Sequence, residues 1–358
     1  MAMKEKRIVF TGGGTAGHVI VNLALIPHFE KAGWEIHYIG SKDGIERELI
    51  EELPHVAYHA ISTGKLRRYM SIENMKDPFK VLKGITDAWR IIGKVKPDII
   101  FSKGGFVSVP VVVAGRMRRV PTIIHESDMT PGLANKLATK FAEKIVTTFP
   151  ETQNYLPQQK AVHVGAVIRE ELFQGDEAVA YELTNLNKKK PIILIMGGSS
   201  GSANVNKVVR TNLPKLLTKY QIIHICGAGN VDKSIDEAGY VQFEYVNEQL
   251  KDVLSIADYV VSRAGANAIY EFLALNIPML LIPLPLSASR GDQIENAKSF
   301  VKNGYAHMLM QEDITEDAFE RAIERLVSDE SALRENMKKE DMQVARDEVI
   351  HLIKSMAK

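Results

Sequence analysis

The sequence has a single cysteine, Cys226, and no long hydrophobic run. One cysteine excludes an internal disulfide and is typical of proteins in a reducing compartment. The longest apolar runs, residues 109–115 and 277–286, are too short or too rich in proline to cross a bilayer. No sustained apolar segment follows the charged N-terminus, so we expect no signal peptide and a cytoplasmic location.

An excess of charge of one sign is also missing. The formal net charge is +1 over 358 residues, which argues against general nucleic-acid binding. Histidine and cysteine do not occur at metal-ligand spacings, and no Asp-x-Asp pair is present to hold a divalent ion on a diphosphate. The sequence therefore predicts chemistry without a metal ion or another cofactor.

What is present is an alternation of short β-like runs and helical patterns, typical of parallel α/β architecture. We expect two doubly wound domains with a hinge near residue 165, and the charged segment 328–358 is expected to be helical. The expected strands are residues 7–11, 35–39, 98–101, 121–124 and 144–147, then, after a pause near 162–169, residues 191–196, 221–225, 240–243, 259–262 and 279–282.

Ligands of doubly wound sheets bind in the loops after the carboxyl ends of the strands. Four such loops stand out, at residues 11–18, 103–110, 197–202 and 262–271. Two loops in each half predict two binding edges that face a central cleft. The first loop, Thr-Gly-Gly-Gly-Thr-Ala-Gly-His, leads into a helical pattern, so its free backbone N–H groups and helix dipole favour an anion.

The first loop also satisfies the dinucleotide fingerprint Gly-x-Gly-x-x-Gly. A nicotinamide enzyme should then carry an acidic residue at the tip of its second strand, but residues 39–42 are Ile-Gly-Ser-Lys. This makes an NAD(P) oxidoreductase the weaker alternative. His18 closes the loop, where a helix N-terminus disfavours the cationic imidazole. A neutral imidazole suits a general base, although a histidine merely bonded to backbone is the simpler interpretation.

The second half offers groups that suit a nucleotide sugar. Backbone N–H groups of residues 197–202 and the Ser199 hydroxyl could bind a diphosphate, and no Gly-Lys-Ser/Thr ending marks a triphosphate loop. Glu271 could accept hydrogen bonds from both ribose hydroxyls. Gln293 and Asn296, one helical turn apart, could bind sugar hydroxyls. Residues 125–128, His-Glu-Ser-Asp, are either catalytic or a cap for the following helix.

A basic segment lies between residues 65 and 96, with nine Lys and Arg against three Asp and Glu. Phe79, Leu82, Ile85, Trp89 and Ile92 recur at helical spacing, which predicts one apolar face. The segment is either a helix with a solvated basic face or a membrane-surface patch. The patch would consist of Arg67, Arg68, Phe79, Lys80, Leu82, Lys83 and Trp89.

The ordered set of these motifs resembles the MurG family of bacterial cell-wall N-acetylglucosaminyltransferases. The matching segments are 12–18, Gly104-Gly105-x-x-Ser108-x-Pro110, His125-Glu126, 132–136, 165–169, 197–202, 262–271 and 292–296. The resemblance implies the GT-B fold, with an acceptor and membrane-facing domain at 1–165, a UDP-sugar domain at 166–340, and a helix at 341–358 returning to the first domain. Val21, Phe106, Ser127, Asp128 and Ser202 depart from the commonest family pattern.

The resemblance also implies partners and residue roles. An inverting transfer from UDP-N-acetylglucosamine to lipid I would form lipid II at the cytoplasmic face of the cell membrane, beside an anionic lipid surface and other cell-wall synthesis proteins. A diacylglycerol glycosyltransferase of the same superfamily and a non-catalytic nucleotide-sugar sensor remain alternatives. His18 and Asp128 are the candidate catalytic residues, and Gly13, Gly14, Gly104 and Gly105 would face the acceptor diphosphate. The candidate residues for UDP-N-acetylglucosamine are Thr15, Gly17, Arg169, Ser199, Val246, Ala266, Asn267, Glu271, Gln293 and Asn296.

Overall fold

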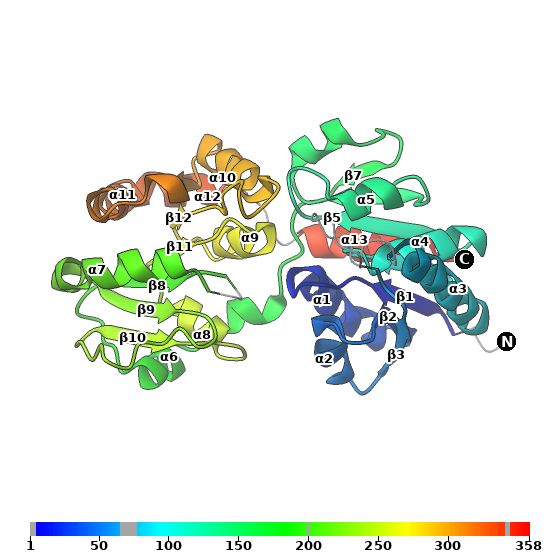
Figure 1. Ribbon diagram of the computed structural model, residues 1–358, viewed down its shortest axis with the longest axis horizontal. Helices are drawn as coiled ribbons and strands as arrows, with labels where there is room; N and C mark the ends of the chain where they lie inside the picture. Colours follow the sequence, from blue (N-terminus) through cyan, green and yellow to red (C-terminus); the bar gives the residue numbers. More distant parts are fainter. Residues whose placement is uncertain (1–4, 65–76, 199–200, 341–343) are drawn as a thin grey trace. The chain divides into compact units, whose positions relative to one another are not determined.

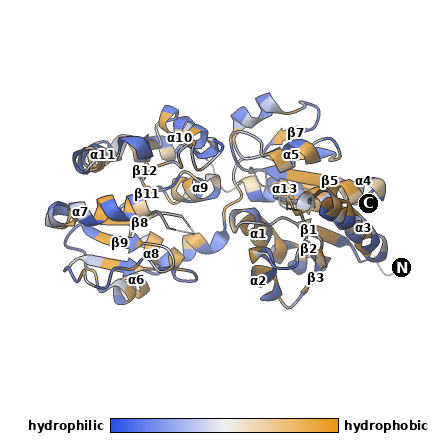
Figure 2. Ribbon diagram, in the orientation of Figure 1, coloured by the Kyte–Doolittle hydropathy of each residue, from blue (hydrophilic) through white to orange (hydrophobic). Residues whose placement is uncertain are grey.

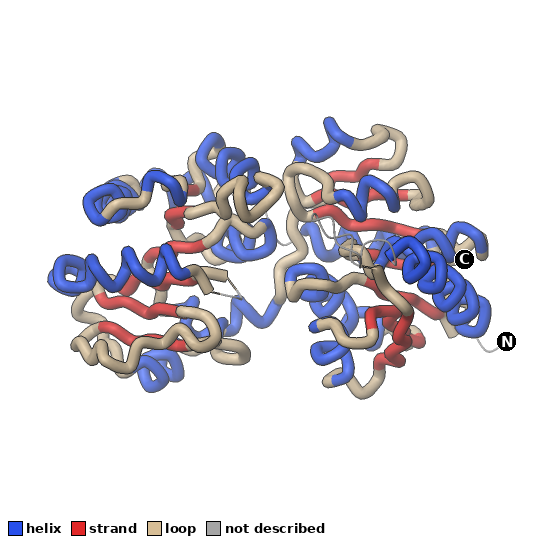
Figure 3. Tube along the Cα trace, in the orientation of Figure 1, coloured by secondary structure: helices blue, strands red, loops and turns tan. Residues whose placement is uncertain are grey.

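The computed structural model describes residues 5–64, 77–198, 201–340 and 344–358 (Figure 1). The chain divides into two compact units. Unit 1 comprises Met1–Val167 and Met342–Lys358, and unit 2 comprises Ile168–Asp341. Each unit has its own parallel sheet with helices around it (Figure 3), and each is described separately below.

Unit 1 contains a seven-stranded parallel sheet in the order β3-β2-β1-β4-β5-β6-β7. The reversal of strand order beside β1 places the loops after β1 and β4 next to each other, which is where ligands of such sheets bind. The strands are β1 (Arg7–Thr11), β2 (Glu35–Ser41), β3 (Val56–Ile61), β4 (Ile99–Ser102), β5 (Thr122–Glu126), β6 (Lys144–Thr147) and β7 (Ala161–His163).

Helices cover both faces of this sheet because its strands are hydrophobic on both sides (Figure 2). Phe10 and Tyr38 pack on one face with Leu25 and Phe29 of α1 and Val349 of α13. The opposite face packs against α3 and α4. The helices of unit 1 are α1 (Gly17–Lys31), α2 (Ile45–Glu51), α3 (Asp77–Val95), α4 (Ser108–Met117), α5 (Leu133–Ala138), the 3-10 helix η2 (Pro150–Tyr155) and α13 (Val344–Met356).

Unit 2 contains a six-stranded parallel sheet in the order β10-β9-β8-β11-β12-β13. Its strands are β8 (Ile192–Met196), β9 (Gln221–Ile225), β10 (Tyr240–Phe243), β11 (Tyr259–Ser262), β12 (Met279–Leu281) and β13 (Ala306–Met308). Buried side chains of α7, α11 and α12 form one core with the sheet. The helices are η3 (Glu170–Gln174), α6 (Glu177–Thr184), α7 (Ala203–Lys219), α8 (Leu250–Ser255), α9 (Ala266–Ala274), α10 (Asp292–Lys302), η4 (Gln311–Asp313), α11 (Glu316–Ser328) and α12 (Glu330–Met337).

The predicted α/β class with two Rossmann-like sheets is confirmed, but three strands were missed. They are β3, β7 and β13; β7 falls inside the segment where the strand series was expected to pause. All three lie at sheet edges, where exposed positions weaken the hydrophobic pattern: β3 and β7 each have only partly buried or exposed residues apart from Ile61. The C-terminal segment, expected to be helical, contains α12 in unit 2 and α13 in unit 1. Within the described ranges, no helix is both long and apolar enough to span a bilayer.

A buried histidine makes the stability of unit 2 sensitive to acid. His224 on β9 is fully buried between the Tyr240 hydroxyl and the Asn206 amide oxygen, at 2.9 and 3.0 Å. Burial lowers its pKa from the usual 6.5 to about 3, with the nearby Arg210 guanidinium acting in the same direction. Below pH 6.5, His224 is therefore protonated in the unfolded chain but neutral in the folded chain, so the free energy of unfolding falls as the pH drops.

Well below pH 6.5 and above pH 3, we expect unit 2 to lose about 1.4 kcal/mol of unfolding free energy per pH unit from this histidine alone. The loss can be followed between about pH 6 and about pH 4 by hydrogen exchange of the β8 and β9 amides. In His224→Gln, the pH slope should be smaller by that amount, whatever the stability of the variant at neutral pH. An unchanged slope would show that His224 does not titrate in this way.

Candidate functional site

The first glycine-rich loop of unit 1 is held by polar side chains beneath it. The Tyr38 hydroxyl donates to the Gly12 carbonyl at 2.8 Å, and the Asn22 amide donates to the Thr11 carbonyl at 3.2 Å. Both side chains are completely buried. The loop backbone is therefore fixed before any ligand binds, as a preorganised binding site requires.

A carboxylate occupies part of the surface that the sequence predicted to be free. Glu46 at the start of α2 is buried and accepts hydrogen bonds from the Gly14 N–H at 3.1 Å and the Ser41 N–H at 3.0 Å. The expectation that all loop N–H groups are free was therefore wrong for Gly14. Burial would raise the pKa of Glu46, but these hydrogen bonds and that of the Ser41 hydroxyl outweigh it and lower the pKa. A side chain at position 13 would collide with the same carboxylate, so Gly13 is needed there.

His18 lies in the first turn of α1, at the end of the first loop. Its Nδ1 is 3.0 Å from the Thr15 hydroxyl, and its backbone N–H donates to the Thr15 carbonyl at 3.1 Å. Gly17 is the first residue of α1. The contact with the Thr15 hydroxyl orients the imidazole, as a positioned general base needs.

The second loop of unit 1 packs directly on the first. Gly104 and Gly105 have φ angles of +99° and +81°, which favour glycine. A side chain on Gly105 would collide with the Gly13 carbonyl. Just before them, Lys103 is 1% exposed, and its Nζ donates to the Ser127 hydroxyl at 2.9 Å. The loops after β1, β4 and β5 thus meet at one edge of the sheet.

The segment after β5 caps a helix, one of its two predicted roles. The Glu126 carboxylate accepts from the Gly132 N–H and the Asn135 amide, both at 2.9 Å, and from the Asp128 N–H at 3.1 Å. Glu126 therefore holds the loop and the start of α5 together. His125 is buried, its ring nitrogens have no hydrogen-bond partner among the described residues, and burial lowers its pKa well below the usual value.

In unit 2, Arg169 and Glu271 form an ion pair. The Arg169 Nε donates to a Glu271 carboxylate oxygen at 3.0 Å, although the residues are 102 positions apart in the chain. Glu271 on α9 is buried, which raises its pKa, while Arg169 acts in the opposite direction. Arg169 also lies 3.5 Å from the more exposed Glu171. A buried carboxylate held in one orientation can accept two hydroxyl hydrogen bonds.

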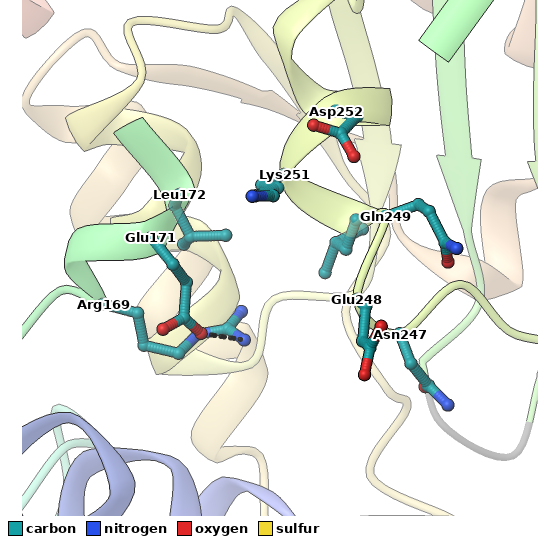
Figure 4. Close-up of a pocket in the computed structure, with 9 residues that line it drawn as sticks. Arg169, Glu171, Leu172, Asn247, Glu248, Gln249, Lys251 and Asp252 are labelled. Carbon is teal, nitrogen blue, oxygen red and sulfur yellow. Dashed lines mark ion pairs between the residues drawn. The ribbon is translucent and has the colours of Figure 1, made fainter. Parts of the chain in front are cut away.

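Arg169 also lines a pocket of about 440 Å³, which lies wholly in unit 2. Figure 4 shows η3 with Arg169, Glu171 and Leu172 on one side, and residues 247–252 on the other. Val246, which directly precedes this second wall, is half-buried. A mixed wall of backbone, amides and carboxylates suits a polar ring with hydrogen-bonding edges.

The loop before α9 is fixed by Arg263, which the sequence analysis missed. Its guanidinium donates to the Ser202 hydroxyl and the Gln311 amide oxygen, both at 2.6 Å, and to the Ile282 carbonyl at 3.0 Å. Ala266 and Asn267 then form the first turn of α9. Burial lowers the pKa of Arg263. This guanidinium therefore places a positive charge beside Ser202, directly before α7.

Gln293 and Asn296 of α10 contact backbone in the structure. The Gln293 amide oxygen accepts from the Ala264 N–H at 3.3 Å and the Leu284 N–H at 3.1 Å. Asn296 is fully buried and donates to the Ala264 carbonyl at 3.1 Å. Their predicted contacts with sugar hydroxyls stay predictions. Ser199, Arg67 and Arg68 lie outside the described residues.

The basic helix was predicted correctly as a helix but not as one apolar face. In α3, Ala88 and Ile92 are buried, whereas Phe79, Leu82 and Trp89 are 74%, 61% and 39% exposed. Gly84 lies close enough to the Ser62 carbonyl to leave no room for a side chain. Gly84 and Ala88 therefore pack inward together with Ile92, whereas Phe79, Leu82 and Trp89 lie at the surface, where Lys80 and Lys83 are also exposed.

The site therefore has two parts, one in each unit. In unit 1 the structure brings together Gly13, Gly14, Gly104, Gly105 and the segment with Asp128; in unit 2 it pairs Arg169 with Glu271. Glu46, Lys103 and Arg263 were missed because charged residues are usually exposed. The signal that could have identified these three residues is their position in the sequence next to glycine-rich loops. Over residues 5–64, 77–198, 201–340 and 344–358, no cluster of three His, Cys, Asp or Glu side chains could hold a metal ion.

Comparisons with known proteins match this two-part arrangement. The glycosyltransferase family 28 N-terminal domain matches residues 8–147, and the glycosyltransferase family 28 C-terminal domain matches residues 192–352. Among solved structures, MurG of Acinetobacter baumannii aligns with a TM-score of 0.78 at 24% identity, over 98% of this chain and 99% of that one. The calicheamicin glycosyltransferase CalG4 aligns with a TM-score of 0.72 at 14% identity, over 99% of this chain and 98% of that one. These two structures show the shared GT-B fold.

Curated relatives are much more similar in sequence. Proteins of Oceanobacillus iheyensis, Geobacillus thermodenitrificans and Staphylococcus aureus are 58%, 55% and 56% identical, over 99%, 99% and 93% of this chain. The match covers 99%, 100% and 94% of those proteins. Each is named UDP-N-acetylglucosamine–N-acetylmuramyl-(pentapeptide) pyrophosphoryl-undecaprenol N-acetylglucosamine transferase. The chain belongs to glycosyltransferase family 28.

Proposed function

We infer that the protein transfers N-acetylglucosamine from UDP-N-acetylglucosamine to lipid I, the undecaprenyl-diphosphate-linked muramyl pentapeptide, and so forms lipid II for peptidoglycan. The full-length match to relatives named for this reaction carries the inference. The two sheets with glycine-rich loops at their carboxyl ends are the architecture that a two-substrate transfer requires.

On the donor side, we propose that unit 2 binds UDP-N-acetylglucosamine. Glu271 would accept hydrogen bonds from the ribose hydroxyls, and the uracil would lie against the backbone near Val246 at the pocket wall. Arg169 and Ser199, with the first turn of α9 at Ala266 and Asn267, would face the diphosphate. Gln293 and Asn296 would bind the sugar. The support is the ion pair of half-buried Arg169 with buried Glu271, beside a pocket of about 440 Å³.

On the acceptor side, we propose that unit 1 binds the acceptor diphosphate over Gly13, Gly14, Gly104 and Gly105, with Thr15 and Gly17 toward the donor sugar. In the transfer step, an acceptor sugar hydroxyl oxygen bonds to the anomeric carbon as the bond to the UDP oxygen breaks, with inversion. His18 accepts the hydroxyl proton, Asp128 assists it, and UDP leaves. Helix N-termini and loop N–H groups stabilise the leaving diphosphate.

Release of UDP with and without lipid I tests this function. Wild-type protein should release UDP from UDP-N-acetylglucosamine only when lipid I is added, and His18→Ala should lower turnover at saturating donor by about 10²–10⁴-fold. Wild-type turnover in His18→Ala would remove His18 from the role of base. Binding of the donor without release of UDP would indicate a nucleotide-sugar sensor. Release of UDP when diacylglycerol is the acceptor would indicate the diacylglycerol glycosyltransferase. Thermal stabilisation by NAD(P)H but not by the UDP-sugar would indicate an oxidoreductase.

We further propose that the exposed face of α3 binds the cytoplasmic surface of the cell membrane. Phe79, Leu82 and Trp89 are exposed, large and apolar, and lysines lie between them. Exposed apolar side chains surrounded by lysines are typical of segments in an anionic lipid interface.

Replacing both Phe79 and Leu82 with serine should weaken binding to vesicles containing anionic lipid by at least about tenfold, because roughly two exposed apolar side chains would no longer enter the interface. Sedimentation with vesicles of phosphatidylglycerol and phosphatidylcholine measures this. A control that replaces exposed Val179 and Leu183 of unit 2 with serine should bind like wild type. Equal binding by all three proteins would exclude α3 as the membrane surface.

A further inference from the structure

Lys103 is a buried cation at the edge of the sheet where the loops of unit 1 meet. Its backbone N–H donates to the Thr11 carbonyl at 2.9 Å, which continues the pairing of β1 with β4 up to the first glycine loop. A side chain on Gly12 would come within 3.1 Å of the Lys103 Cβ. The lysine stem therefore runs directly under the first loop, and Gly104 and Gly105 follow it in the chain.

The ammonium group of Lys103 faces the segment after β5. It donates to the Ser127 hydroxyl at 2.9 Å, and the carboxylates of Glu126 and Asp128 are near enough to favour its charged form. Burial opposes them and lowers its pKa, and the same charge lowers the pKa of the neighbouring His125. The ring nitrogens of His125, which have no hydrogen-bond partner within the described ranges, add unsatisfied polar atoms to this edge.

Without Lys103, this edge would be strongly negative. Glu46 contacts Gly14, and Glu126 and Asp128 lie behind the second loop. Carboxylates in a low-dielectric environment repel an approaching anion more strongly than they would in water. A buried ammonium among them offsets this repulsion and fixes the backbone that carries Asp128.

We propose that Lys103 is a positioning residue for acceptor recognition: its ammonium anchors the Ser127–Asp128 segment and makes the two glycine loops of unit 1 attractive to a diphosphate. This rests on the proposed function, in which the acceptor carries a diphosphate. The side chain is too buried to touch the ligand, so it acts through the loop backbone and through its charge.

Steady-state kinetics of Lys103→Met test this role. Methionine keeps the apolar stem and removes the charge, so KM for lipid I should rise about 10- to 100-fold, with KM for UDP-N-acetylglucosamine within about twofold of wild type. Lys160→Met is the matched control, because Lys160 is a half-buried lysine of unit 1 whose Nζ donates to the Thr139 and Ala142 carbonyls at 3.0 and 2.8 Å. It should leave both constants unchanged.

Two further measurements separate the charge from a structural effect. Burial lowers the pKa of Lys103, so in wild type KM for lipid I should rise with increasing pH before an ordinary lysine loses its proton, and this rise should be absent in Lys103→Met. If that variant does not fold, a flat wild-type profile overturns the proposal by itself. Wild-type KM for lipid I in a folded Lys103→Met, or an equal rise in Lys160→Met, also overturns it.

Binding of inorganic pyrophosphate, with UDP added to saturation, keeps this proposal distinct from the proposed function. If wild type does not turn over lipid I, the proposed function fails. Weaker pyrophosphate binding in Lys103→Met than in Lys160→Met would still support a diphosphate site at these loops. Equal pyrophosphate binding in Lys103→Met and Lys160→Met would refute the positioning role of Lys103.

Discussion

Alanine at position 271 is expected to lower kcat/KM for UDP-N-acetylglucosamine by about 10²–10⁴-fold. In the proposed donor site, the variant would lack the two charge-assisted hydrogen bonds that Glu271 accepts from the ribose, each contributing roughly 1.5–3 kcal/mol. The half-buried Arg169 guanidinium would also lose the carboxylate that orients it at 3.0 Å. Because the contact is made in the ground state as well, UDP affinity measured by calorimetry should fall together with kcat/KM.

Two controls make this expectation specific. Glu177→Ala removes an exposed glutamate of unit 2 that pairs with Lys188 at 2.7 Å, and it should change neither quantity. Glu271→Gln keeps one acceptor oxygen, so it should lie between wild type and alanine. Wild-type UDP affinity in Glu271→Ala would mean that the ribose binds elsewhere.

Glu126→Ala is expected to destabilise unit 1 by about 3–5 kcal/mol. The carboxylate accepts from the Gly132 N–H, the Asn135 amide and the Asp128 N–H, and all three hydrogen bonds would be lost. Lys103 would at the same time lose a nearby negative charge. Removal of one partner from a buried charged cluster commonly costs this much, because the remaining charge stays buried.

Urea unfolding followed by tryptophan fluorescence can measure this cost for unit 1 alone, because Trp34 and Trp89 are the two tryptophans of the chain. The matched control is Glu143→Ala. Its carboxylate accepts one backbone hydrogen bond, from Thr122 at 2.7 Å, and is partly exposed, so the expected loss is about 1 kcal/mol. A similar loss of unfolding free energy in both variants would show that Glu126 does not stabilise this loop more than Glu143 stabilises its own surroundings.

Much of the fold could be predicted from the sequence because the central strands are hydrophobic on both faces. The central strands β1, β6, β9 and β11 begin and end at the predicted residues, and so does the edge strand β10. The edge strand β3 could not be recognised, since half-exposed residues such as Tyr58 and His59 carry no clear alternation. The same limit applies to α3. Gly84 and Ala88 pack inward there, so the positions of the large apolar residues do not show which face of the helix is buried.

The glycine loops and Glu271 could be predicted as candidate site residues, because short sequence motifs indicate them. The charged residues that support those loops could not be predicted in this way. Glu46 reaches Gly14 from 32 positions away, and Arg263 reaches Ser202 from 61 positions away. Such pairs depend on which strand ends become neighbours, and strand order is a property of the whole sheet. Lys103 belongs to the same group, since its partner Ser127 lies just after the neighbouring strand β5.

The place of α13 has a consequence for how the chain is made. Val349, Ile350 and Ile353 of α13 complete the core that contains Phe10 and Phe29, although unit 2 separates them in the sequence. During synthesis, unit 2 is therefore translated in full before unit 1 receives this helix. Until α13 has been synthesised, the apolar surface of unit 1 that α13 covers stays exposed. N-terminal domains usually finish folding first, but here unit 1 can complete its core only after unit 2 has been translated.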